Sequence, residues 1–124
     1  MRKAEAQEIP TLFQVVHRAV EVCDPVGSED GPADLLRRFE DRDEPVTAAG
    51  DVEQQIAEAE GAIDPQDEDP VAVMTAAVAT YLAFRRTEME REPRELLALA
   101  ARAEFDADPP EPVARWLDAQ GVTV

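Results

Sequence analysis

The chain contains very few of the residues with which most enzymes perform chemistry. Its 124 residues include one cysteine, one histidine, one serine and one lysine, and they include no asparagine. The single cysteine, Cys23, excludes an intramolecular disulfide, and this is typical of proteins that work inside the cell. No apolar run precedes Pro10, so we expect no signal peptide and predict a cytoplasmic protein.

The few reactive residues stand in contexts that argue against catalysis. His17 and Cys23 are six positions apart, about 600° around a helix, so they point to different faces. Ser28 lies in a loop that has neither a nearby base nor a G-x-S-x-G motif. The five glycines are scattered, so they form no phosphate-binding loop. We therefore do not expect an enzyme, and we expect no cofactor.

Carboxylates are the only abundant groups that could bind a metal ion. The acid-rich segments 24–35 and 64–73 lack the ligand positions and the central glycine of a calcium loop. The acidic stretch 47–62 lacks the Glu-x-x-His pairs that di-iron helical proteins require. A carboxylate-based metal-binding protein therefore remains an alternative function, and we predict no metal site.

The composition favours one helical domain. The chain is long enough to bury a core of its own, and alanine is abundant while glycine is scarce. We predict a flexible N-terminus over residues 1–8, a single all-helical domain over residues 9–121 and a C-terminal tail over residues 122–124.

An uncharged run, PVAVMTAAVATYLAF, occupies residues 70–84. Its apolar residues fall on nearly every side of a helix, which is typical of a helix buried among others. The run is shorter than the roughly 20 residues of a membrane span, so we expect no membrane insertion. It predicts a central buried helix over residues 70–88, before Pro93. Four alanines would let a second copy approach closely, so a homodimer stays open: Ala72, Ala76, Ala79 and Ala83.

Helical spacing and proline starts predict about five further helices. They cover residues 10–23, 32–39, 47–62, 93–105 and 112–120. An acid followed by proline recurs about every 40 residues, which is the length of a helical-hairpin repeat. The fold class is therefore all-α, a compact bundle in which three stacked αα-hairpins are one arrangement. The alternative is that capping alone explains the recurrence.

Acidic residues are concentrated in the middle of the chain. The net charge is −16, and residues 21–69 hold 17 acids against 3 bases. Adaptation of a whole proteome to high salt would explain acidity in general, but it would spread the acids more evenly. The other reading is an acidic interaction face formed by Asp41, Asp43, Glu44, Asp51, Glu53, Glu58, Glu60, Asp64, Asp67 and Glu68.

Three function classes follow. The first is a small acidic helical module that binds a protein partner or regulates it, without a catalytic site. The second is a nucleic-acid mimic, in which the carboxylates of residues 21–69 occupy a basic groove on a target protein. The third is the carboxylate-based metal-binding protein. Direct nucleic-acid binding is not expected, because the sequence presents no basic face.

Overall fold

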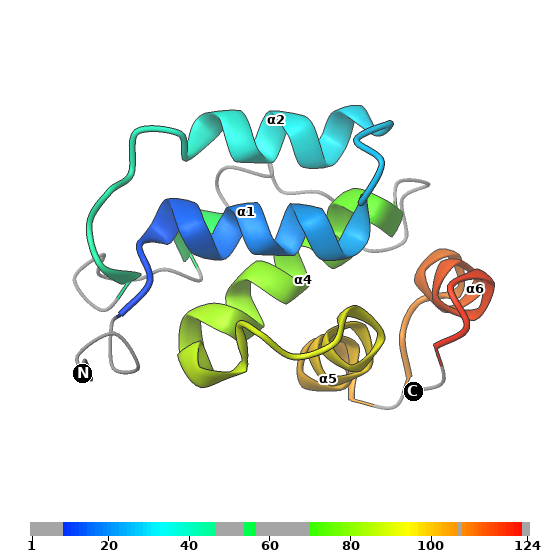
Figure 1. Cartoon of the computed structure of the whole chain (residues 1–124). Coiled ribbons are helices and arrows are strands. Elements are labelled where there is room, and N and C mark those ends of the chain that lie inside the picture. Colours follow the sequence, from blue (N-terminus) through cyan, green and yellow to red (C-terminus); the bar gives the residue numbers. More distant parts are fainter. Residues whose placement is uncertain (1–8, 47–53, 57–69, 107, 123–124) are drawn as a thin grey trace.

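The computed structural model describes residues 9–46, 54–56, 70–106 and 108–122, which fold as packed helices (Figure 1). The elements are α1 (Leu12–Cys23), α2 (Asp30–Arg38), α4 (Pro70–Phe84), the 3₁₀ turn η3 (Arg86–Glu88), α5 (Pro93–Phe105) and α6 (Glu111–Ala119). Within those ranges the only β pairing is an isolated bridge between Thr11 and Pro45. The all-α prediction is confirmed.

Helix α4 lies at the centre of the bundle, and α1, α2, α5 and α6 all pack against it (Figure 1). Its apolar side chains face every direction, so it can be buried on several sides at once. The hydroxyl of Thr75 donates to the Val71 carbonyl at 2.7 Å, which satisfies this buried polar group. The predicted central helix is confirmed. Its buried residues are Val71, Ala72, Met74, Thr75, Ala77, Val78, Ala79, Leu82 and Ala83.

The central helix ends at Phe84, and the chain reaches residue 88 through the 3₁₀ turn η3 rather than by further α-helical turns. A long-range tie follows this turn. Arg18 of α1 donates from Nε to the Met89 carbonyl and from Nη2 to the Arg91 carbonyl, both at 3.0 Å. These bonds hold the connection between α4 and α5 against α1.

Helix α1 begins at Leu12, two residues later than the predicted start at Pro10, because Thr11 and not Pro10 caps it. The Thr11 hydroxyl accepts the Gln14 amide at 3.0 Å, and the Gln14 side chain accepts the Thr11 amide at 2.9 Å. This reciprocal pair is a capping box. Carbonyls of residues 42 and 44 accept the next two amides, so segment 42–46 is fixed against the start of α1.

A buried carboxylate shapes the turn between α1 and α2. Asp24 is only 6% exposed, and its two oxygens accept the amides of Ser28 at 3.1 Å and Glu29 at 3.0 Å. Gly27 has a φ of +69°, a conformation that favours glycine. The turn brings α2 back along α1, so these two helices form a hairpin (Figure 1).

The α1–α2 hairpin is not repeated in the rest of the described chain. Helices α5 and α6 each pack more extensively against α4 than against each other, so α4 and not a repeated hairpin organises this half. The expected helix over residues 47–62 falls largely outside the described residues. Its described part, residues 54–56, is helical, and Ile56 is buried. Among the helices that the structure describes, none has the length and apolar content to cross a membrane.

Candidate functional site

Helix α6 lines two hollows of the described surface, and local sequence fixes both of its ends. It starts as predicted, with Pro112 in the first turn. At its end Gly121, with a φ of +77°, donates its amide to the Asp118 carbonyl at 3.0 Å. The Val122 amide donates to the Leu117 carbonyl at 2.9 Å, which completes a Schellman motif. The motif buries Val122, a residue that the sequence placed in the tail.

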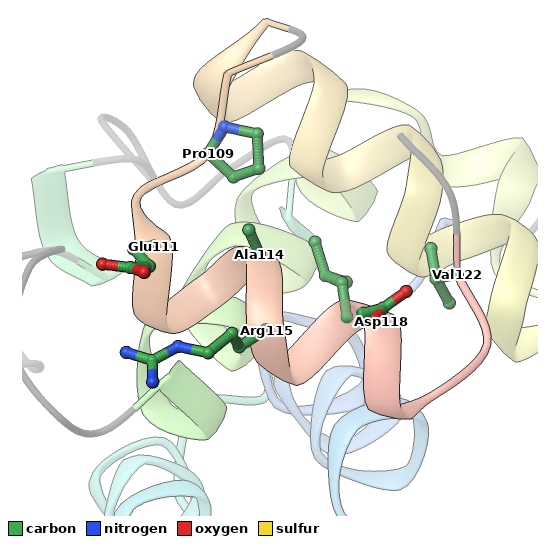
Figure 2. Close-up of a pocket in the computed structure, with 7 residues that line it drawn as sticks. Pro109, Glu111, Ala114, Arg115, Asp118 and Val122 are labelled. Atoms are coloured by element: carbon green, nitrogen blue, oxygen red, sulfur yellow. The ribbon is translucent and has the colours of Figure 1, made fainter.

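The first hollow, of about 380 Å³, follows one side of α6 (Figure 2). Apolar side chains at the end of the helix form part of its lining, and charged side chains stand along it. Figure 2 shows Glu111 and Asp118 at opposite ends of this row, with Ala114 between them. The lining residues are Pro109, Glu111, Ala114, Arg115, Leu117, Asp118 and Val122.

A second hollow, of about 520 Å³, lies where α6 meets the start of α4. Pro70, Pro112 and Trp116 give it an apolar wall, and Arg115 borders it as well as the first hollow. Trp116 is the only tryptophan of the chain and is partly exposed. Together the two hollows make the edge of α6 an uneven surface with one cation in the middle.

Three charged residues of this edge have no ionic partner in the part of the chain that the structure describes. Glu111, Arg115 and Asp118 are exposed and form no salt bridge there. They are spaced four and three residues apart, so they share one face of α6. Two other exposed arginines are paired, Arg37 with Asp34 and Arg91 with Glu88, each at 2.6 Å, whereas the exposed Arg38, Arg85, Arg94 and Arg102 likewise form no salt bridge among the described residues.

The position of Asp118 is electrostatically unfavourable. It lies in the last turn of α6, beside the free carbonyl groups, and this turn holds no basic residue. A carboxylate at this end of a helix dipole destabilises an exposed helix by about 0.3–1 kcal/mol. Glu111 is in the first turn, where the same dipole favours a negative charge. Asp118 forms no salt bridge among the described residues, and the guanidinium of Arg94 lies beside Gly121 at the same end of the helix.

The acidic face expected from the sequence is described only in part. Asp41 and Asp43 are exposed, whereas Glu44 is half-buried and paired with Arg42 at 2.6 Å. The hydrogen bond from Arg42 lowers the pKa of Glu44 from its ordinary value. The remaining members lie outside the described residues, so their role stays a prediction: Asp51, Glu53, Glu58, Glu60, Asp64, Asp67 and Glu68.

The few reactive side chains are kept apart. His17 is about half exposed, and its Nδ1 lies 3.8 Å from the Glu21 carboxylate. Cys23 is buried, and burial raises the pKa of its thiol to about 12. Ser28 serves the turn by hydrogen bonding to Asp24. Across the described ranges, no three His, Cys, Asp or Glu residues are grouped closely enough to hold a metal ion.

Comparison with family models, with curated proteins and with solved structures found no match for this chain. The edge of α6, with its two hollows, is therefore the candidate site. Sequence reasoning found the helix but not the hollows beside it. The signal that it overlooked is the pair Gly121-Val122, because a glycine at this helix end followed by an apolar residue folds that residue back onto the helix.

Proposed function

We propose that this protein is a small acidic interaction or regulatory module that binds a protein partner along the edge of α6. The observation that carries the proposal is the pair of hollows on the two sides of Arg115. Apolar hollows with a few polar groups at their rims are the usual form of a binding surface. The unpaired charges of this edge would gain partners on binding, which gives the site specificity.

The partly exposed Trp116 supports the same proposal. Tryptophan and arginine are enriched among the residues that dominate binding energy at interfaces, and Trp116 and Arg115 are neighbours on the wall of the second hollow. The single thiol is free and buried, which suits a reducing cytoplasm. We accordingly propose a cytoplasmic module without a catalytic role.

The test is to fill the first hollow and to compare partner capture. Ala114 is half-buried in the lining, so Ala114→Trp places a large side chain where a partner would dock. Ala119 is an exposed residue of the same helix outside both linings, so Ala119→Trp is the matched control. Tagged wild type and both variants are incubated with extract of the native host, and retained proteins are quantified by mass spectrometry.

We expect one protein to be retained by wild type and by Ala119→Trp in similar amounts, and to be lost with Ala114→Trp. Circular dichroism and urea unfolding establish that both variants fold. Retention that is equal for all three proteins would contradict docking at this edge.

One observation supports the alternative function, a nucleic-acid mimic. Asp43 lies within segment 42–46 and Asp41 directly precedes it; both are exposed, and hydrogen bonds hold this segment against the start of α1. This reading predicts a basic target whose binding weakens steeply with salt and with Asp41→Asn plus Asp43→Asn. Capture that survives about 1 M salt, where charges are screened beyond roughly 3 Å, would contradict it.

A further inference from the structure

We propose that the segment which docks in the first hollow is an amphipathic helix of another protein, bearing two cations with one acid between them. This inference rests on the proposed function and adds the chemistry of the partner. Its basis is the order of charge along α6: Glu111, Arg115 and Asp118 read acid, base, acid on one face.

The spacing sets the dimensions of the complement. Glu111 and Asp118 are seven residues apart, which is about 10 Å along a helix axis and nearly two full turns. A helix that lies alongside α6 presents side chains at the same interval on one face, so its charges can match all three residues. No described residue offers a strand edge, so the binding of an extended strand by β-pairing has no template here.

The orientation follows from the helix ends. An antiparallel partner places its N-terminal end, which carries partial positive charge, beside Asp118 and the carbonyl end of α6. From its N-terminus the partner then reads cation, acid and cation with spacings of three and four residues. Apolar side chains between these charges would enter the hollow beside Leu117 and Val122.

Charge also excludes a second copy of this chain as the occupant. If two α6 helices met antiparallel, Glu111 of each would face Asp118 of the other, and if they met parallel, like charges would coincide. With a net charge of −16 on each chain, the approach is opposed at long range as well. The unpaired acids at both ends of the row therefore point to a different protein with local positive charge.

The test uses the purified full chain and helical peptides of about 15 residues, held helical by side-chain bridges because peptides this short are marginal helices in water. One peptide has the pattern Lys-x-x-Glu-x-x-x-Lys with leucine between the charges. The second has the charges inverted, and the third has glutamine at the three positions. Binding is followed by the fluorescence of Trp116, the only tryptophan, which lies next to Arg115.

We expect the first peptide to bind about tenfold more tightly than the inverted peptide, since exposed ion pairs have modest strength each. The variant with Glu111→Lys, Arg115→Glu and Asp118→Lys should reverse this preference. All three residues are exposed, so this variant should remain folded. Equal affinity for the inverted or glutamine peptide, or an unchanged preference in the variant, would overturn the inference.

Two results separate this inference from the proposed function. If Ala114→Trp abolishes capture of the partner but no peptide binds, the chemistry assigned to the partner is wrong and docking at α6 stands. If Ala114→Trp leaves capture unchanged, the proposed function fails and this inference fails with it. Sedimentation of the chain at rising concentration gives a third result, the oligomeric state. If the wild type forms a dimer and the charge-reversed variant does not, the occupant is a second copy of this chain and the inference is overturned.

Discussion

Cys23 shows how one buried residue is excluded from chemistry by its surroundings. Its side chain is buried at the end of α1, beside Asp24. Burial raises the pKa of the thiol from 9.0 to about 12, and the charge of Asp24 acts in the same direction. The protein therefore holds the neutral thiol, which is a poor nucleophile.

The first prediction concerns the pH dependence that follows. The pKa of Cys23 is higher in the folded state than in the unfolded state, so its contribution to stability is complete below about pH 9 and is lost as the pH rises towards 12. The free energy of unfolding should fall over this window, and Cys23→Ala should remove part of the fall. Urea unfolding at a series of pH values measures both. Rapid reaction of the folded protein with a thiol reagent at about pH 8 would contradict the burial.

Arg18 is the residue that joins parts of the chain far apart in sequence, and its role gives the second prediction. Its guanidinium donates to the carbonyls of Met89 and Arg91. Because charged hydrogen bonds contribute about 1.5–3 kcal/mol and the bond to Met89 is partly buried, Arg18→Ala should lower the free energy of unfolding by about 2 kcal/mol. The matched control is Arg37→Ala, which removes an exposed pair with Asp34 and should change it by less than about 0.5 kcal/mol. If the two variants lost similar amounts of unfolding free energy, the hydrogen bonds of Arg18 would contribute no more to stability than an exposed ion pair.

At the scale of the elements, local chemistry in the sequence predicted most helix starts. Pro93 and Pro112 stand in the first turns of α5 and α6, as expected from the fit of proline to these positions. The sequence did not reveal the tie beyond the end of α4, because Arg18 lies 71 positions before Met89, whose carbonyl accepts its hydrogen bond. The hollows of α6 were equally hidden, since they depend on how α6 packs beside α4.

The two acids of α6 give the third prediction, in which chemically identical changes have opposite effects. Asp118→Asn removes a negative charge from the carbonyl end of the helix and should raise the free energy of unfolding by about 0.5 kcal/mol. Glu111→Gln removes one from the amide end and should lower it by a similar amount. Urea unfolding at low salt measures both values. A loss of stability with Asp118→Asn would show that Asp118 supports the fold. Its charge would then be no evidence for a role in binding.

At the scale of the whole molecule, negative charge is the dominant property. The described acids include ion-paired ones, such as Glu44 and Glu88, and exposed ones without a salt bridge, such as Asp41 and Asp43. Pairing explains part of the acidic composition locally, but 28 acids against 12 bases leave a large uncompensated excess. The same excess repels like-charged molecules and attracts a basic partner, so stability and binding should respond to salt in opposite directions.

The fourth prediction tests this opposition in one series of experiments. Rising salt screens the repulsion among the acids, so the midpoint of thermal unfolding should increase up to about 1 M salt. Over the same range the affinity for the Lys-x-x-Glu-x-x-x-Lys peptide should fall, because its ion pairs are screened too. Asp41→Asn with Asp43→Asn should reduce the salt response of the midpoint while leaving that of the peptide unchanged, since these residues do not line the α6 hollow. A midpoint that is flat with salt would mean that the acids are too well separated to repel, and a peptide affinity that is flat would mean that apolar contact alone directs docking.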